Sequence, residues 1–437
     1  MNKLLVVSPH FPPVNAADHH RVRLALPYLR GLGWEPTVLA VEPDSVEGAV
    51  LDPLLSATFP ADIRVIRVRG LRPRAFGGFR LGGLWWRCGR ALRRAGDRLL
   101  ASEHFDAAFF SSTVFDSFKL GPRWLSRHRL PYVLDYQDPW INDYYDRTGA
   151  APPGGRLKYA WNQFRARRAE PAVLRGAARV IAVSPAYARG LAAAYPWFDA
   201  GCVLILPFGA ASVDWDVLKH HSPAQPLINF DDGFQHHVYV GRAGSDMAPA
   251  LTILFRAFRR FQGSDPERAA RLRFHFIGTN YAPPPLGRDW VVPIAQQEGV
   301  AAAVSEHRGR VGYFDALHYL SKAHALVVVG SDDPSYNASK LFPYALARRP
   351  TLLILGERSP AADFAARIDL GVRCLFGAGG EGIEARRRAD EVWRIWFVEE
   401  GCACVRPFDE AAFAPFTAAS LAAALASVFD GAAQTGG

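Results

Sequence analysis

The strongest candidate for chemistry is a loop in the second half of the chain whose residue types suit a phosphate group. The apolar run at residues 325–329 is followed by GSDDPSYNASKLFPYALARRP, which leaves a buried strand and enters a helix. Asn337 or Ser339 can cap that helix, and Lys340 adds a positive charge to its first turn. Free N–H groups and the positive end of the helix dipole favour an anion there. A plain capping segment with Lys340 in solvent is the alternative interpretation.

A second candidate phosphate loop follows Val240, where the sequence reads GRAGSDM. Gly241 lets the backbone approach a ligand closely, and Arg242 can make forked contacts to phosphate oxygens. Taken alone, the loop is explained more simply by a glycine turn with a surface arginine. Because Arg242 and Lys340 follow two strands of one predicted sheet, however, both can reach a single diphosphate, and this convergence is the stronger signal.

The first half of the chain offers acid–base groups near the ends of its predicted strands. Asp138 lies in YQDPW, where its carboxylate can orient an acceptor hydroxyl or accept its proton, although a turn cap is the simpler role. His19 and His20 are candidate proton acceptors or phosphate partners, but surface histidines are the simpler interpretation. Asp18 most simply caps the first helix, and Arg21 then projects near the start of that helix.

The elements that position these residues alternate as in doubly wound α/β domains. Short apolar runs predict buried parallel strands, and the stretches between them show helical periodicity. The predicted strands are residues 3–8, 36–41, 63–68, 107–111, 132–135, 180–183 and 203–207, then 237–240, 272–277, 325–329 and 351–355. Ligands of such sheets bind beyond the carboxyl ends of strands, so function is expected in the loops that follow them.

Length and patterning predict two domains that face each other across a cleft. A chain of 437 residues exceeds one ordinary core and suits two domains of about 200 residues each. We expect a Rossmann-like domain at residues 1–207, a linker at 208–233, a second Rossmann-like domain at 234–410, and a C-terminal helix and tail at 411–437. The expected fold class is therefore α/β, with two doubly wound sheets.

The composition of the chain limits the classes of partner that we expect the protein to bind. The net charge of +9 favours anionic partners such as nucleotide phosphates or an acidic membrane. The five cysteines have neither zinc-site nor disulfide-framework spacing, and Asp332-Asp333 lacks the spacing of a metal-binding D-x-D motif, so no metal is expected. No recognised nucleic-acid module frames the basic residues. No apolar run is long enough for a signal peptide or a membrane span, which predicts a cytoplasmic location.

One arginine-rich stretch suggests a membrane contact. Residues 64–98 hold eleven arginines and one acidic residue, Asp97. The arginines at positions 87, 90, 93, 94 and 98 give a helix a basic side, and Leu84, Trp85 and later leucines give it an apolar side. Such a helix can lie on an anionic surface at the inner face of the plasma membrane. The alternative is an arginine-rich helix packed on its own domain.

Several segments together resemble the family-4-type retaining glycosyltransferases with the GT-B fold. The opening SPHFPPVNAADHHRVRLALPYLRGLGWEPTVL is similar to their first strand, Pro-Pro loop and helix, and VLDYQDPW resembles their D-F-R-D-P-W stretch. RVIAVSPAYARGL, VYVGR and SYNASKLFPYALARRP resemble three further family segments in the same order. Order and spacing over about 350 residues carry the resemblance more than any single motif does.

The resemblance implies a division of roles. The donor nucleotide sugar would contact the second domain, at Gly241, Arg242, Thr279, Tyr313, Ser335, Tyr336, Asn337, Ser339 and Lys340. The acceptor would contact the first domain, at Asn15, Asp18, His19, Arg21 and Asp138. Asp138, Arg242 and Lys340 are the predicted catalytic residues, and no cofactor or metal is implied. Two glutamates common in the family are replaced here by Ser335 and Pro343.

The sequence thus predicts a hexosyltransferase of retaining type, which moves a sugar from a nucleotide sugar to a hydroxyl of a carbohydrate or lipid-linked acceptor in polysaccharide or glycolipid synthesis. Two alternatives remain open. One is a nucleotide-sugar epimerase on the same fold, and the other is a non-catalytic sugar-nucleotide-binding protein of a polysaccharide locus. The missing glutamate pair favours the second alternative.

Overall fold

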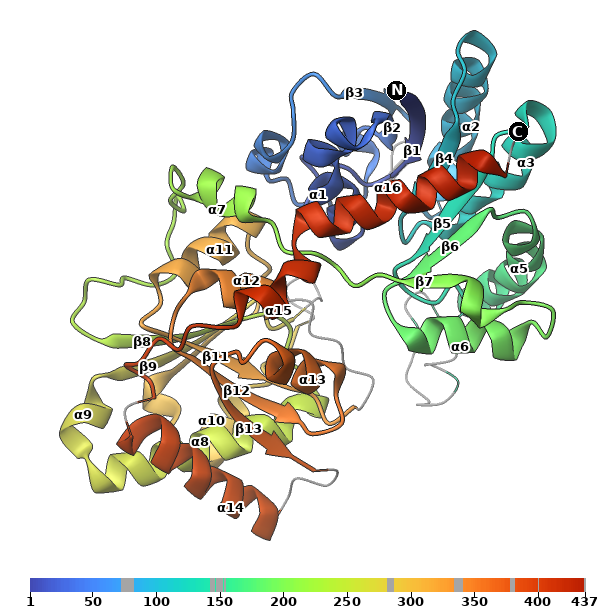
Figure 1. Cartoon of the computed structure of the whole chain (residues 1–437). Helices are drawn as coiled ribbons and strands as arrows, with labels where there is room; N and C mark the ends of the chain where they lie inside the picture. Colours follow the sequence, from blue (N-terminus) through green and yellow to red (C-terminus); the bar gives the residue numbers. More distant parts are fainter. Residues whose placement is uncertain are drawn as a thin grey trace, which may run out of the picture. The chain divides into compact units, whose positions relative to one another are not determined.

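The chain forms two compact units, Met1–Ala211 with Phe416–Gly437, and Ser212–Pro415. The computed structural model (Figure 1) describes residues 1–71, 82–141, 146, 152, 155–280, 287–333, 341–377, 382–399 and 401–435. The boundary between the two units follows Ala211, within the predicted linker at 208–233. The larger part of this linker, which includes α7 (Ser212–Leu218), belongs to the second unit.

The first unit is built on a seven-stranded parallel sheet in the order β3-β2-β1-β4-β5-β6-β7. Its strands are β1 (Asn2–Val7), β2 (Trp34–Val41), β3 (Arg64–Val68), β4 (Ala107–Ser111), β5 (Tyr132–Tyr136), β6 (Arg179–Ala182) and β7 (Val203–Ile205). Its α-helices are α1 (His20–Leu29), α2 (Leu84–Ser102), α3 (Leu120–His128), α5 (Arg156–Arg175), α6 (Pro185–Ala194) and α16 (Ala418–Gln434). Strand order reverses between β1 and β4, where open α/β sheets bind ligands.

Alternate residues of β1 enter the two layers that cover this sheet. Leu4 and Val6 lie in a cluster with side chains of α1 and α16, whereas Leu5 and Val7 lie in a cluster with side chains of α2 and α3. Both clusters are almost fully buried, which is why β1 is continuously apolar from Leu4 to Val7 rather than alternating.

The C-terminal helix α16 belongs to the first unit, although the sequence preceding it belongs to the second (Figure 1). Phe429 packs against Trp34 and Phe109, with ring centroids 5.6 and 5.1 Å apart. The Trp34 indole N–H donates a hydrogen bond to Asp430, at 2.9 Å. The chain therefore passes between the units twice, once near Ala211 and once near Pro415.

The second unit is built on a six-stranded parallel sheet in the order β10-β9-β8-β11-β12-β13. Its strands are β8 (Gln235–Val240), β9 (Leu272–Ile277), β10 (Val304–His307), β11 (Ala325–Val329), β12 (Thr351–Gly356) and β13 (Val372–Phe376). Its α-helices are α7, α8 (Ala248–Ser264), α9 (Pro266–Ala270), α10 (Val292–Gln297), α11 (Tyr313–Lys322), α12 (Leu341–Ala347), α13 (Pro360–Arg367), α14 (Ile383–Val392) and α15 (Glu410–Phe413). Here the strand order reverses between β8 and β11.

The apolar side of α2 is not free for a membrane. Cys88, Leu92 and Leu99 are buried in the core of the first unit, and the Arg87 guanidinium donates to the carbonyls of Ser45 and Leu71. For the apolar side of this helix, packing on its own domain is therefore the correct interpretation. No helix among the described residues is both long and apolar enough to cross a bilayer.

Buried histidines make the second unit sensitive to acid. His237 is almost fully buried beside the rings of Phe274 and Trp396, and burial lowers its pKa from 6.5 to about 3. Burial likewise lowers the pKa of His275, to about 4. Below pH 6.5 the unfolded chain binds protons that the folded chain does not, so the free energy of unfolding decreases as the pH falls. For His237 alone the loss at about pH 5 is roughly 2 kcal/mol.

We expect His237→Phe to reduce the drop in melting temperature between about pH 7 and pH 5, because phenylalanine keeps the ring packing and does not titrate. Thermal unfolding followed by circular dichroism measures this drop. His104→Phe is the control, because the His104 side chain is 83% exposed and its replacement should leave the drop unchanged. An unchanged drop in the His237 variant would contradict the assignment.

Candidate active site

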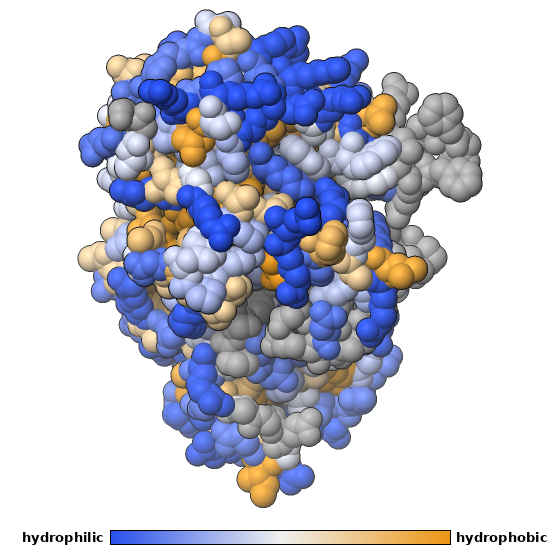
Figure 2. All heavy atoms as spheres, turned by 90° about the vertical axis from the view of Figure 1, so that its right-hand side faces the viewer, coloured by the Kyte–Doolittle hydropathy of each residue, from blue (hydrophilic) through white to orange (hydrophobic). Residues whose placement is uncertain are grey.

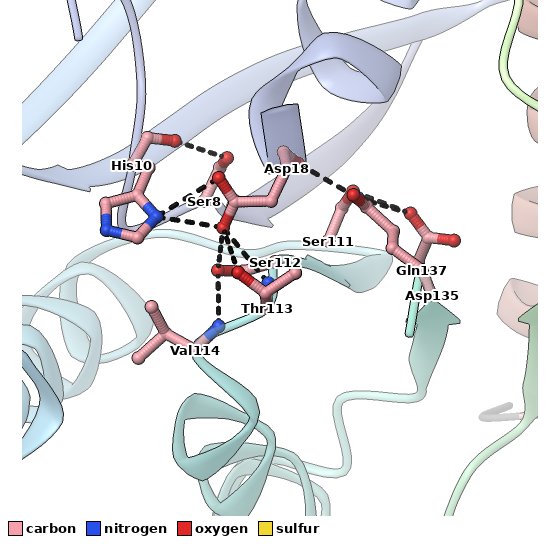
Figure 3. A network of polar contacts seen from close by, with 9 residues as sticks. All are labelled: Ser8, His10, Asp18, Ser111, Ser112, Thr113, Val114, Asp135 and Gln137. Atoms are coloured by element: carbon pink, nitrogen blue, oxygen red, sulfur yellow. Dashed lines mark hydrogen bonds and ion pairs between the residues drawn. The ribbon is translucent and has the colours of Figure 1, made fainter. Parts of the chain in front are cut away.

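The carboxylate of Asp18 organises the strand-order reversal of the first sheet (Figure 3). It accepts hydrogen bonds from the Ser112 hydroxyl at 2.9 Å, and from the Thr113 backbone N–H and hydroxyl at 3.0 Å each. It also contacts His10 Nδ1 at 2.9 Å. His10 follows β1, whereas Ser112 and Thr113 follow β4, so one carboxylate joins the two loops at the reversal.

His10 and Asp18 form a histidine–carboxylate pair with a defined tautomer. Burial lowers the pKa of His10, but the hydrogen bond and charge of Asp18 outweigh it, so the pKa lies above 6.5. Burial also raises the pKa of Asp18, and His10, Thr113 and Ser112 together bring it well below its usual value. With Nδ1–H donated to Asp18, the lone pair is on Nε2, which has no hydrogen-bond partner within the described ranges. The His10 side chain is 20% exposed, so the ring is not sealed from solvent.

A second buried network, centred on Gln137, lies beside this pair. The Gln137 amide donates to the backbone oxygen of Asp18, to Ser111 and to Asp135, at 2.9 Å each (Figure 3). Asp135 Oδ2 also accepts from Arg21 Nε at 2.8 Å, and both partners are fully buried. Gln137 therefore holds the end of β5 against the loop that carries Asp18.

Asp138 follows Gln137 and has a different environment. It is exposed, and no hydrogen bond to its carboxylate is found in the part of the chain that the structure describes. Nearby protein still removes enough hydration to raise its pKa, and the charge of Asp18 raises the pKa further. A cavity of about 350 Å³ begins beside it, lined by Pro139, Trp140, Tyr187 and parts of α5 and α6.

Three predictions for the first domain are wrong. Asp18 does not cap a helix, because its carboxylate binds the loop after β4 instead. Arg21 does not project toward an acceptor. It is buried and donates to Asp135 and to the carbonyls of Leu206 and Pro207. His19 is fully buried rather than on the surface, and burial lowers its pKa to about 3.

His20 is partly buried, and burial lowers its pKa well below 6.5. Asn15 is also partly buried, and its backbone N–H donates to Val50.

The loop after β8, a predicted phosphate loop, lies at the strand-order reversal of the second sheet. Arg242 follows β8, and its guanidinium makes a forked ion pair with both oxygens of Asp246, at 3.0 and 2.8 Å. The Tyr344 hydroxyl of α12 accepts the Val240 N–H at 2.8 Å, so α12 is joined to the end of β8. Lys340 immediately precedes α12 in the sequence. The Tyr344–Val240 hydrogen bond places α12 next to the loop that holds Arg242.

Carboxylates surround the described part of this site. Burial raises the pKa of Asp246, but hydrogen bonds from Arg242 and Ser331 and the charge of Arg242 outweigh it and lower the pKa. Burial and the charges of Asp246 and Asp333 raise the pKa of Asp332. A cavity of about 200 Å³ lies at the ends of β11, β12 and β13, lined by Asp332, Asp333 and residues 356–359.

The other predicted donor residues are only partly described. The Gly241 N–H donates to Ile277 at 2.9 Å. Thr279 is fully buried, and its hydroxyl has no hydrogen-bond partner in the described ranges. The Tyr313 hydroxyl donates to Asp214 at 2.5 Å. Ser335, Tyr336, Asn337, Ser339 and Lys340 lie outside the described residues.

Across the residues that the structure describes, no group of three or more His, Cys, Asp or Glu side chains is arranged to hold a metal ion.

His10, Ser112 and Thr113 were not predicted from the sequence as site residues. The available signal was their position directly after β1 and β4, the two strands at the reversal.

Comparisons with known proteins agree with this architecture. Residues 19–209 match the family model of the glycosyl transferase 4-like domain. The fold of the whole chain resembles that of sucrose-phosphate synthase from Thermosynechococcus elongatus, at 16% identity and a TM-score of 0.60, with 98% of each chain covered. It also resembles the Anabaena protein HepE in complex with UDP, at 13% identity and a TM-score of 0.57, with 98% of this chain and 100% of that chain covered.

A putative UDP-N-acetylglucosamine 2-epimerase from Listeria monocytogenes has a similar fold as well, at 13% identity and a TM-score of 0.51, with 96% and 93% of the chains covered. No curated protein matches the sequence. The chain therefore has the GT-B fold of two Rossmann-like units. More particularly, residues 19–209 of the first unit are similar to the glycosyl transferase 4-like domain.

We expect Asp18→Asn to lower the free energy of unfolding by about 2–4 kcal/mol, because it removes a buried charge that His10, Ser112 and Thr113 all contact. Chemical denaturation near neutral pH measures the loss. The stability that the carboxylate contributes is present above its unfolded pKa of 3.8 and is lost as the pH falls below that value. Asp138→Asn is the control, with an expected change within about 0.5 kcal/mol. Equal effects of the two variants would contradict the assignment.

Proposed function

We propose that the protein transfers a sugar from a nucleotide-sugar donor to an acceptor hydroxyl. The observation that carries the proposal is the His10–Asp18 pair at the strand-order reversal of the first sheet, just before residues 19–209, which match the glycosyl transferase 4-like domain model. It is a hydrogen-bonded proton acceptor at the place where such sheets bind ligands. The second unit binds the donor, and the first unit binds the acceptor.

Donor binding depends on fixed positive charge. Arg242 and Lys340 neutralise the diphosphate as it leaves, which is the largest expected contribution to catalysis. Gly241 lets the phosphates approach the backbone. Ser335, Tyr336, Asn337 and Ser339 contact the sugar and ribose, and Thr279 and Tyr313 lie beside the base. The orphaned Thr279 hydroxyl is a buried group that a ligand can satisfy.

Proton transfer is assigned to His10. Its Nε2 accepts the proton of the acceptor hydroxyl, and Asp18 stabilises the imidazolium that forms, since the Nδ1–H already points to the carboxylate. Asp138 is exposed and accepts a hydrogen bond from the acceptor, which orients the reacting hydroxyl. The aromatic cavity that begins at Pro139 is the place for the remainder of the acceptor.

The resemblance supports a hexosyl donor, retention of configuration, and a product in polysaccharide or glycolipid synthesis. Ser335 and Pro343 replace the glutamates that the family commonly carries, so His10 and Asp138 are the acid–base groups offered in their place. No metal takes part in the proposed reaction.

The replacement of the glutamate pair by Ser335 and Pro343 favours the non-catalytic alternative, a protein that binds a sugar nucleotide without turning it over. The guanidinium of Arg242 is already neutralised by Asp246, and a diphosphate must compete with that carboxylate. Nucleotide binding without turnover, over a broad panel of acceptors, would support this alternative. Donor consumption without any acceptor would support an epimerase.

We expect one class among UDP-, GDP-, ADP- and dTDP-sugars to raise the melting temperature, and Arg242→Ala and Lys340→Ala each to weaken its binding at least about tenfold, since a charged hydrogen bond contributes about 1.5–3 kcal/mol. Asp246→Asn should strengthen binding, because it removes the competing carboxylate. Thermal shift and calorimetric titration measure these effects. Arg394→Ala is the matched control, because Arg394 forms an ion pair with Glu399 elsewhere in the second unit. No shift with any nucleotide would refute the donor site.

We expect His10→Gln to lower kcat about 10²- to 10⁴-fold with little change in donor affinity, because glutamine cannot accept the proton. Asp138→Asn should chiefly raise the KM for the acceptor. Nucleotide release from the donor identified by thermal shift measures both. In the wild type the rate should fall below the raised pKa of His10, where the imidazole is protonated. Full activity of the His10 variant would leave Asp138 as the proton acceptor.

A further inference from the structure

Helix α5 carries an apolar stripe that the rest of the first unit does not cover. Leu157, Trp161 and Phe164 recur at helical spacing on one side of the helix and are 91%, 60% and 55% exposed. The Trp161 and Phe164 rings stack with centroids 5.8 Å apart. Large apolar side chains gathered in this way mark a contact surface, whereas single exposed ones need no explanation.

Basic residues flank the stripe on both sides. α5 contains Arg156, Lys158, Arg165, Arg167, Arg168 and Arg175, and its single acidic residue, Glu170, is buried. On a helical wheel, Arg156 and Arg167 lie to one side of the stripe, Lys158 and Arg165 lie to the other, and Arg168 continues the stripe itself. The exposed surface of α5 is therefore both apolar and strongly positive.

α5 lies on the right-hand side of the first unit in Figure 1, and Figure 2 looks onto that side, where apolar residues stand among hydrophilic ones. The other side of α5 is anchored in the unit. Val173 and Leu174 are buried in its core, and Arg165, at the margin of the stripe, is tied to the unit by an ion pair with Asp116 at 3.1 Å. The helix thus presents the stripe from a fixed support.

We propose that α5 docks the protein on an anionic lipid bilayer, with Leu157, Trp161 and Phe164 in the interface and the flanking basic residues on the headgroups. Exposed aromatic and leucine side chains with arginine and lysine beside them are the combination that an anionic lipid surface attracts. A second copy of the chain fits less well, because a symmetric contact would place two rows of arginine and lysine against each other. α2 fits less well because its apolar side is in the core.

The docking is independent of sugar transfer, so it can be tested without donor or acceptor. We expect the full-length protein to sediment with vesicles of phosphatidylglycerol and phosphatidylcholine, and much less with phosphatidylcholine alone. Trp161→Ser combined with Phe164→Ser should reduce the bound fraction at least about tenfold, and Lys158→Gln combined with Arg168→Gln should reduce it several-fold and weaken its dependence on salt.

Trp86→Ser is the matched control, because Trp86 on α2 is also 60% exposed and lies within the arginine-rich stretch. It should bind vesicles as the wild type does, and unchanged melting temperatures would show that all variants fold. Loss of binding in the Trp86 variant but not in the Trp161 variants would overturn the assignment to α5. No binding to anionic vesicles, or a dimer that the Trp161 variants split, would overturn the membrane as the occupant.

Discussion

The buried charge of Asp18 is the constraint on which the first unit depends. A carboxylate at 3% exposure is tolerable only where hydrogen bonds replace its lost hydration, and this one receives them from the loops after β1 and β4. Those two loops meet only where the strand order reverses. The charge therefore fixes the relative positions of the loops, and it holds His10 through Nδ1 at the edge of the sheet.

In each unit a carboxylate lies beside a basic side chain, but the consequence for that side chain differs between the units. In the first unit a carboxylate and a histidine lie together, and the pair keeps a basic nitrogen available. In the second unit the carboxylate of Asp246 neutralises the arginine that should meet a diphosphate. A ligand with two phosphates can displace Asp246 only if it supplies more negative charge than that carboxylate does. In the proposed function, a diphosphate at the Arg242 loop would therefore compete with Asp246.

The sequence predicted the architecture because buried parallel strands leave a strong apolar signal. The central strands β1, β4, β9 and β11 were found nearly to the residue. The edge strands β10 and β13 were missed, because Val304–His307 is only half-buried and polar, and Val372–Phe376 alternates. The docking of α16 on the first unit was not predicted either, since an alanine-rich helix carries no sign of the sheet it will cover.

The site was harder to predict because residue type does not reveal burial. Asp18, His19 and Arg21 were expected at the start of the first helix, where they lie, but they are buried, whereas a polar run at a helix start suggests a surface. Their partners lie far along the chain. Ser112, Thr113 and Asp135 are each more than 90 residues away, and only the folded sheet brings them near. His10 lies in the opening segment SPHFPP, but it was not predicted as a site residue, because its role depends on its contact with Asp18.

The surface of α5 and the acceptor side of the site are physically connected. Glu170 of α5 accepts hydrogen bonds from Tyr136 at 3.2 Å and from Tyr195 at 2.7 Å, and Tyr136 ends the strand that leads to Gln137 and Asp138. Burial raises the pKa of Glu170, and the two hydroxyls partly offset this effect. The helix proposed to rest on lipid is thus hydrogen-bonded to the strand that precedes Asp138, the residue proposed to orient the acceptor. That arrangement favours an acceptor that is itself held at a membrane, because the hydroxyl and the surface would then meet the same rigid part of the unit.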